Sequence, residues 1–161
     1  MSIPDSHPYQ TDGWERDIYP MPSFPMLTVD DVDRTSTWYQ SLGFVDVFTL
    51  RDNDQKALLA HLRWSRYADI LISRARRPIE GPRGQGITLN FMSFSPDAVA
   101  ERAREMGAEI VEGPLNRPWN ARDVTIADPD GQRLNFTGPL PRDGTSTPSF
   151  EEVMDRAKRQ A

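Results

Sequence analysis

The sequence contains no cysteine, and it has no uninterrupted apolar stretch of about 18 residues, the length that a membrane span needs. The first absence excludes a disulfide framework, a thiolate nucleophile and zinc bound by cysteine. The second argues against a transmembrane helix. The start of the chain, residues 1–22, is polar and lacks the basic and apolar regions of a secretory signal. We therefore expect a cytoplasmic protein that does not associate with a membrane.

An excess of basic charge is also absent. The chain has 19 Lys and Arg against 24 Asp and Glu, a net charge of −5. Because phosphate contacts need a basic face, nucleic acid is not an expected partner. The acidity fits either general solubility or attraction of a cationic ligand. The one basic cluster, Arg74, Arg76, Arg77 and Arg83, is surrounded by proline and glycine and predicts a solvated linker.

Familiar catalytic patterns are missing too. The sequence has no Cys–His pair, G-x-S-x-G, P-loop or G-x-G-x-x-G motif. Of its two histidines, His7 falls in the N-terminal tail, and His61 sits mid-strand as a packed or surface residue. Asp128 and Asp130 belong to an Asp-Pro-Asp-Gly sequence, which predicts a turn and not acid–base chemistry. We predict no catalytic residue.

Two helix patterns of equal length stand out among the residues that are present. One runs from Asp31 to Gly43 and the other from Ser95 to Gly107. Asp31 and Ser95 are suitable N-cap residues, and each glycine suits the left-handed conformation that ends a helix. The starts of the two patterns are 64 residues apart, and so are their ends. This spacing indicates a duplicated unit.

Each helix pattern is preceded by one strand-like run and followed by three. We expect these strands at residues 24–29, 44–50, 57–64 and 69–73, and again at 87–93, 109–111, 123–127 and 133–137. The order predicts an α+β fold of two βαβββ repeats, at residues 22–74 and 86–140, joined by a linker at 75–85. Residues 1–21 form an N-terminal tail. In the tail at 141–161, a cap at Thr147 or Ser149 and a stripe through Phe150, Val153, Met154 and Ala157 predict a C-terminal helix.

Several short sequences within these repeats resemble one protein family. They are Leu27-Thr28-Val29-Asp30-Asp31, Trp38-Tyr39, Leu42-Gly43-Phe44, Met106-Gly107-Ala108, Glu112-Gly113-Pro114, Pro118-Trp119, Arg122, and Asp128-Pro129-Asp130-Gly131 with Leu134 and Phe136. In this order and spacing they resemble the vicinal oxygen chelate superfamily, in particular its glyoxalase/bleomycin-resistance branch. The resemblance covers residues 22–140. It implies a curved, incomplete barrel around a cleft, with the helices outside, and a homodimer that shares two clefts.

The resemblance also implies where metal ligands would lie in metal-dependent members. The ligand on the opening strand falls on Phe24, its counterpart in the second half on Thr88, and the ligand on the last strand on Asn135. A fourth position lies within residues 69–72. Phenylalanine cannot bind a divalent ion, and threonine and asparagine are poor substitutes for His, Asp or Glu. We therefore expect no metal and no other cofactor.

Strand alternation extends this inner face to further residues, if Phe24 and Thr88 lie on it. The alternate residues Val29 and Phe91, and on the last strand Leu134 and Phe136, would then point toward the helices. Trp119 and Arg122 would stand at its rim, and Trp64 would add flat surface. The predicted ligand-binding residues are Phe24, Met26, Thr28, Trp64, Thr88, Asn90, Met92, Trp119, Arg122, Asp123, Thr125 and Asn135. Such a mixture of aromatic, thioether and polar groups is typical of a small-molecule site.

Three functions are compatible with these features. The first is a metal-independent protein that sequesters an aromatic or antibiotic-like molecule in a dimer cleft. The second is a glyoxalase- or dioxygenase-type enzyme (a lyase, isomerase or oxygenase). It would be either metal-free, using Arg122, Asp123 or Tyr67, or dependent on a metal held by other residues. The third is a regulatory or scaffold dimer with a vestigial cleft.

Overall fold

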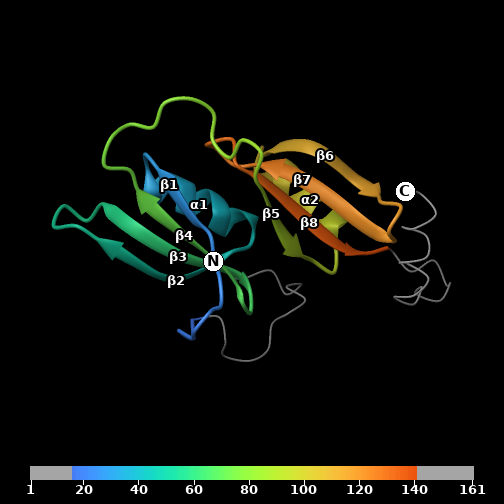
Figure 1. Cartoon of the computed structure of the whole chain (residues 1–161), viewed down its shortest axis with the longest axis horizontal. Coiled ribbons are helices and arrows are strands. Elements are labelled where there is room, and N and C mark those ends of the chain that lie inside the picture. The colour runs from blue at the N-terminus through green and yellow to red at the C-terminus, as the bar shows by residue number, and fades with distance from the viewer. Residues whose placement is uncertain (1–15, 141–161) are drawn as a thin grey trace. The chain divides into compact units, whose positions relative to one another are not determined.

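The computed structural model describes residues 16–140, and these form two successive βαβββ repeats (Figure 1). The first contains β1 (Met26–Val29), α1 (Val32–Leu42), β2 (Val45–Arg51), β3 (Ala57–Ser65) and β4 (Ala68–Arg74). The second contains β5 (Thr88–Met92), α2 (Pro96–Glu105), β6 (Glu109–Asn116), β7 (Ala121–Ala127) and β8 (Arg133–Pro139). The predicted α+β class and repeat order are confirmed. His7 and the predicted C-terminal helix lie outside the described residues.

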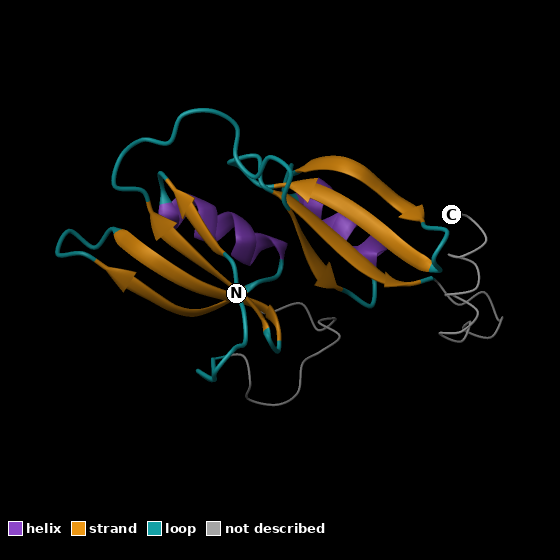
Figure 2. Cartoon of the chain, in the orientation of Figure 1, coloured by secondary structure: helices purple, strands orange, loops and turns teal. Residues whose placement is uncertain are grey.

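The described residues divide into two compact units, residues 16–86 with 128–132, and residues 87–127 with 133–140. Each holds one four-stranded sheet, with strand order β1-β4-β3-β2 in the first unit and β5-β8-β7-β6 in the second. The β1/β4 and β5/β8 pairs are parallel and the other pairs are antiparallel. In each unit the helix crosses one face of its own sheet (Figure 2), and no helix formed by residues 16–140 covers the other face.

Local sequence explains where the helices start and stop. The Asp31 side chain accepts a hydrogen bond from the Arg34 amide at 2.9 Å, and the Ser95 hydroxyl accepts one from the Ala98 amide at 3.3 Å. These bonds satisfy amides that a helix N-terminus leaves without a partner. Gly43, with φ of 130°, closes α1 by donating its amide to the Tyr39 and Gln40 carbonyls. Both predicted N-caps are therefore confirmed. Within residues 16–140, neither helix has the length and hydropathy that a membrane span needs.

Alternation along the strands decides which side chains form the two cores. The faces toward the helices carry buried apolar residues, namely Val29, Leu62, Ile70 and Ile72 in the first unit and Phe91, Val124, Ile126, Leu134 and Phe136 in the second. Neighbouring residues point to the opposite face, since successive side chains of a strand alternate. The predicted helix-facing orientation of Val29, Phe91, Leu134 and Phe136 is confirmed.

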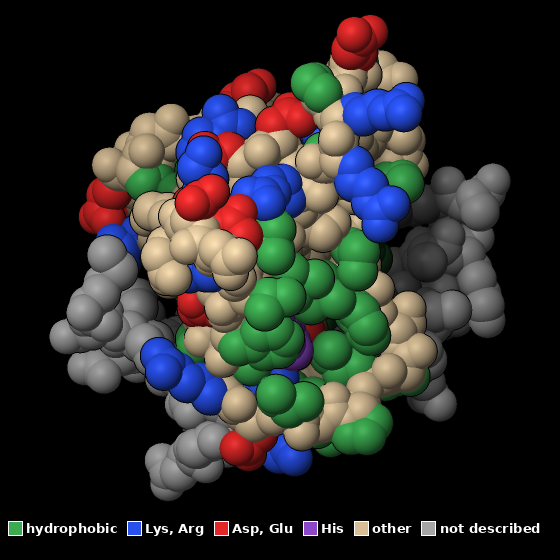
Figure 3. Space-filling view, turned by 90° about the vertical axis from the view of Figure 1, so that its left-hand side faces the viewer, with side chains coloured by type: hydrophobic (Ala, Val, Ile, Leu, Met, Phe, Trp, Pro, Cys, Tyr) green, Lys and Arg blue, Asp and Glu red, His purple; other side chains and the backbone are tan. Residues whose placement is uncertain are grey.

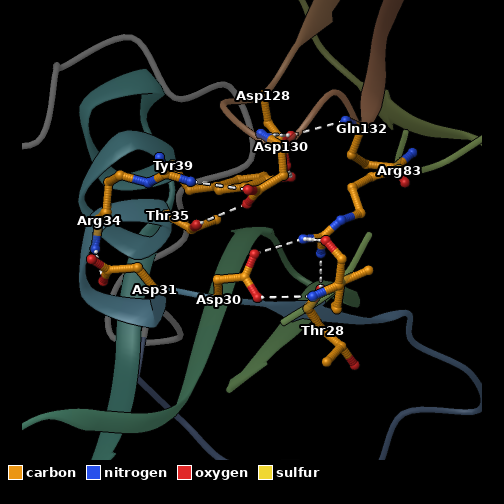
Figure 4. A network of polar contacts seen from close by, with 11 residues as sticks. Thr28, Asp30, Asp31, Arg34, Thr35, Tyr39, Arg83, Asp128, Asp130 and Gln132 are labelled. Carbon is orange, nitrogen blue, oxygen red and sulfur yellow. Dashed lines mark hydrogen bonds and ion pairs between the residues drawn. The ribbon is translucent and has the colours of Figure 1, made fainter. Parts of the chain in front are cut away.

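The turn at residues 128–132 packs on α1 and belongs to the first unit (Figure 4). Tyr39 donates its hydroxyl to Asp128 at 2.9 Å, and Asp130 accepts from Arg34 at 2.9 Å and from Thr35 at 3.1 Å. Asp128 also accepts the amides of Asp130 and Gln132, each at 2.9 Å, as expected of an Asx-type turn. The predicted turn is confirmed, and its carboxylates additionally anchor it to the helix.

Two of the four arginines expected in a solvated linker are held by carboxylates. Arg83 donates to Asp30 at 2.8 Å and to the Thr28 carbonyl at 3.0 Å (Figure 4), and Arg74 donates to Asp52 at 3.0 Å. The expectation is therefore wrong for Arg74 and Arg83, because acidic residues in the loops after β1 and β2 lie within reach of their guanidinium groups. Arg76 and Arg77 are exposed, as expected.

Strand β6 is longer than predicted, ending at Asn116 and not at residue 111. Gly113 and Pro114 normally indicate the end of a strand. Here β6 is an edge strand, and its pairing with β7 shifts register between Ile110 and Glu112 and again between Glu112 and Leu115. Such irregularities accommodate both residues, so that the strand continues through them.

Candidate functional site

The open face of the second sheet, meaning its face without a helix, is polar. Asn90 of β5 lies opposite Asn135 of β8, which lies opposite Thr125 of β7. Asn135 donates its amide to the Asn90 side-chain oxygen at 2.9 Å and accepts the Thr125 hydroxyl at 3.1 Å. A cavity of about 500 Å³ covers this row and is lined by Thr88, Asn90, Val111, Glu112, Arg117, Thr125, Arg133 and Asn135. We call it the polar pocket.

Arg117 forms one side of the polar pocket and is held between two carboxylates. It donates to Glu112 and, at 3.0 Å, to Asp123. These two hydrogen bonds raise the pKa of the Arg117 guanidinium above its ordinary value. Asp123 is buried, and its Oδ1 atom has no hydrogen-bond partner among residues 16–140. The exposed ring of Trp119 lies under the Arg117 guanidinium, 5.8 Å from the ring centroid. The pocket therefore contains fixed charges, and the exposed ring of Trp119 lies next to its Arg117.

The open face of the first sheet is apolar. Its exposed large apolar side chains are Phe24, just before β1, Met26 of β1, and Phe48 and Leu50 of β2. Their exposed fractions lie between 42% and 56%, which is unusual for residues of this kind. Figure 3 shows hydrophobic side chains gathered around a hollow on this side of the molecule, with a histidine visible within it. We call this surface the apolar face.

The histidine in the hollow is His61, the one histidine among the described residues. Its Nε2 atom lies 2.6 Å from Asp69 Oδ2, and its ring meets Phe48 edge-on at 5.3 Å between centroids. Arg63 binds both oxygens of Asp69, Oδ1 through Nε at 2.8 Å and Oδ2 through Nη2 at 2.7 Å. Burial lowers the pKa of Arg63, but its hydrogen bonds and charge interaction with Asp69 outweigh this and raise it. The buried ion pair of Arg63 and Asp69 thus lies beneath the apolar face, and the His61 imidazole is hydrogen-bonded to it.

The predicted ligand-binding residues fall into several groups. Met26 and Thr28 lie on the open face of the first sheet, and Thr88, Asn90, Met92, Asp123, Thr125 and Asn135 share the open face of the second. Thr88 and Asn135 line the polar pocket. Whether Phe24 joins them in one cleft stays a prediction.

Two predicted ligand-binding residues point elsewhere. Trp64 is buried in the first core, where it contacts Phe44 at 5.3 Å between ring centroids, because its position in β3 alternates with the open-face residues. Arg122 donates to Asp97 of α2, with Nη2 2.6 Å from Oδ1, and therefore lies on the helix-facing side of β7. Asp97 holds the pKa of Arg122 above its ordinary value through this bond. We do not retain either residue as a ligand contact.

Sequence analysis missed the group of His61, Arg63 and Asp69. The signal was available, since alternation places residues 61 and 63 on one face of β3, and a hairpin brings residue 69 opposite Arg63. The turn between β3 and β4, however, contains no glycine, asparagine or proline. Tyr67 adopts the positive φ of 66° that such a turn requires, which non-glycine residues rarely do. The pairing was therefore difficult to recognise from the sequence.

The strand registers also identify the fourth of the positions where the family resemblance places metal ligands. Asn135 lies opposite Asn90, and 64 residues earlier Leu71 lies opposite Met26 in the same parallel arrangement. The four positions therefore carry Phe24, Leu71, Thr88 and Asn135. This donor set does not fit a divalent ion, which requires several imidazole or carboxylate groups. Among residues 16–140, no three His, Asp or Glu side chains gather in an arrangement suitable for a metal.

Comparison with known proteins agrees with this architecture. Residues 23–136 match the family model of the glyoxalase/bleomycin resistance protein/dioxygenase superfamily, and the chain belongs to this superfamily. Among solved structures, TioX from Micromonospora sp. ML1 is 21% identical, with a TM-score of 0.60 over 73% of this chain and 97% of TioX. A glyoxalase-related enzyme from Clostridium phytofermentans is 20% identical, with a TM-score of 0.58 over 77% of this chain and 98% of that protein. At these identities the likeness shows the fold alone.

A comparison with curated proteins gives one partial match of another kind. The large ribosomal subunit protein uL1 of Neisseria meningitidis is 35% identical over 97 residues, which cover 48% of this chain. The chain spans only 40% of the length of that relative. A match of this extent carries no argument about the function of the chain.

Proposed function

We propose that this protein binds an aromatic or antibiotic-like small molecule stoichiometrically and without a metal. The observation that carries the proposal is the apolar face, where Phe24, Met26 and Phe48 are exposed. Figure 3 shows hydrophobic side chains gathered around a hollow on this side. Contiguous exposed apolar surface of this kind is characteristic of interaction sites. The residues at the family's metal-ligand positions further support binding without a metal, because they do not fit a divalent ion.

Taken by itself, the polar pocket of the second unit suits a ligand that carries hydrogen-bonding groups. Its amides and hydroxyls are already arranged by side-chain hydrogen bonds, so that binding need not order them. Asp123 Oδ1 is a buried acceptor that a ligand donor or a water molecule would satisfy. Trp119, next to Arg117, offers a flat exposed ring for stacking.

A homodimer is part of the proposal. Strands β1, β2, β5 and β6 are edge strands of the two described sheets, and each pairs on one side only. Unpaired strand edges and exposed apolar surface favour association with a second chain. We also propose a cytoplasmic location, which the lack of cysteine supports.

A thermal-shift screen of planar aromatic compounds tests the proposal. A ligand that binds only the folded state raises the melting temperature, and the rise grows with the logarithm of its concentration once this exceeds Kd. We expect stabilisation by polycyclic aromatic compounds and none by aliphatic compounds of equal size. Failure of every aromatic compound to bind would overturn the proposal.

A metal-free enzyme is the second candidate function, and one observation favours it. His61 is hydrogen-bonded to a carboxylate at 2.6 Å, which is the usual arrangement of a histidine that accepts a proton from a substrate. Mass spectrometry of a bound compound after prolonged incubation distinguishes the two functions. Recovery of the unchanged compound in a one-to-one ratio supports capture, whereas a changed product indicates turnover.

A further inference from the structure

The hydrogen bonds around Asp69 determine which nitrogen of His61 carries a proton. Asp69 accepts two bonds from the Arg63 guanidinium, and both side chains are fully buried. A carboxylate paired in this way is ionised and can only accept hydrogen bonds. The Nε2 atom of His61 at 2.6 Å must therefore be the donor. In the neutral imidazole, this assignment leaves Nδ1 as an acceptor.

The accepting nitrogen has no partner among residues 16–140. Within them, the Asp69 bond and the edge-on contact with Phe48 account for the interactions of His61. The side chain is only 8% exposed, so little water reaches it. Arg63 is itself fixed by the Asp17 carbonyl at 2.8 Å and by the Tyr19 ring at 4.2 Å, so the imidazole is held from below. An acceptor in such a position favours a ligand that donates a hydrogen bond.

We propose that the apolar face selects aromatic molecules that carry a hydroxyl or N–H group, with His61 accepting the hydrogen bond from that group. Asp69 and Arg63 are positioning residues that fix the tautomer and orientation of the imidazole. The inference rests on the proposed capture of aromatic molecules and specifies their chemistry. A purely apolar ring would cover Nδ1 without pairing it, whereas a donor at the same place would satisfy it.

Carbazole and dibenzofuran are suitable probes because they share one planar shape. Carbazole has an N–H group where dibenzofuran has an ether oxygen. In a fluorescence titration of the full chain at pH 8, we expect carbazole to bind about fivefold to a hundredfold more tightly than dibenzofuran. In His61→Leu, whose side chain has no hydrogen-bond acceptor, the two affinities should become equal within about twofold. Leu50→Ala, on the same face, is the matched control and should weaken both probes alike.

A second measurement does not depend on a variant that folds. Heteronuclear NMR of isotope-labelled histidine follows the two histidines of the chain, and His7→Gln assigns them. Carbazole should shift the Nδ1 resonance of His61, and dibenzofuran should not.

The outcomes are distinct. Equal affinity of the two probes for the unmodified protein, or tighter binding of dibenzofuran, overturns the role of His61 but leaves aromatic capture intact. Carbazole binding that moves no His61 resonance overturns the same inference. If neither probe nor any other aromatic compound binds, the proposed function itself fails.

Discussion

The bond between Tyr39 and Asp128 should stabilise the first unit measurably. Tyr39 is completely buried in α1, and its hydroxyl donates to the Asp128 carboxylate at 2.9 Å. Burial raises the pKa of Asp128 above its ordinary value, despite the bonds from Gln132 and Tyr39 that lower it. The hydroxyl therefore supports a carboxylate that water reaches poorly. Tyr39→Phe removes this one bond and leaves the ring in place.

We expect Tyr39→Phe to lower the free energy of unfolding by about 1.5–3 kcal/mol at neutral pH, the usual range for a hydrogen bond to a charged group. Urea denaturation followed by circular dichroism measures the difference. Tyr67→Phe is the matched control, because Tyr67 is exposed and no hydrogen bond of its hydroxyl occurs within the described residues. The control should change stability by less than about 0.5 kcal/mol. A loss in Tyr39→Phe no larger than in the control would refute the reasoning.

The pH dependence gives an independent check on each side of neutrality. The hydroxyl favours the ionised form of Asp128, so the difference between Tyr39→Phe and the original protein should shrink as pH falls through the raised pKa of Asp128. Burial, together with Asp128, raises the pKa of Tyr39 well above 10.0. Its contribution is therefore complete below about pH 10 and is lost as pH rises further, because only the unfolded chain ionises there. The variant should lack this alkaline loss.

Four further predictions concern binding and assembly. Trp119→Ala should lower the affinity for an aromatic probe several-fold in calorimetry, since stacking contributes about 0.5–1.5 kcal/mol. Arg122→Lys should leave this affinity unchanged, because Arg122 is bound to Asp97. The reverse pattern would contradict the proposed binding site. Light scattering at micromolar concentration should give the mass of a dimer, and a sharp monomer mass would contradict it. Elemental analysis of purified protein should find no near-stoichiometric nickel, zinc, manganese or iron. Because the chain has no cysteine, the double variant Phe24→Cys, Asn135→Cys can be spin-labelled at these two positions. A short distance between the two labels, within one chain or between chains, would support the prediction that Phe24, Thr88 and Asn135 lie in one cleft.

The sequence was sufficient to predict the elements whose signals are local. Asp31 and Ser95 are caps, and strand alternation correctly assigned Val29 and Phe91 to the helix-facing sides. Contacts between side chains far apart in the sequence were harder to predict. The Asp97 bond that takes Arg122 away from the open face joins residues 25 positions apart, and nothing near either residue indicates it. We predicted Trp64 as a ligand contact because its flat ring would suit a binding surface. Its position in the alternation of side chains along β3 instead turns it into the core, where it is buried.

The two repeats differ most on the faces without a helix. Positions 64 residues apart occupy equivalent places in the strand registers. Toward the helices these positions are apolar in both repeats, as in Leu62 and Ile126, Ile70 and Leu134, and Ile72 and Phe136. On the open faces their chemistry differs, as in Met26 and Asn90, Leu71 and Asn135, and His61 and Thr125.

Packing explains the first pattern, since every helix-facing position must fill a core. Packing does not explain why the open faces differ in chemistry, because side chains there need not fill a core. His61 and Thr125 are the informative pair. Each lies on the central part of its open face, opposite Leu71 and Asn135 respectively, and each offers hydrogen-bonding groups there. Thr125 donates its hydroxyl to Asn135 within the polar pocket. His61 stands among apolar side chains, and its bond to Asp69 is its only hydrogen bond within the part of the chain that the structure describes. Burying an imidazole and an ion pair beneath an apolar surface costs free energy of desolvation. Packing does not explain why His61 is placed there, whereas accepting a hydrogen bond from a ligand does.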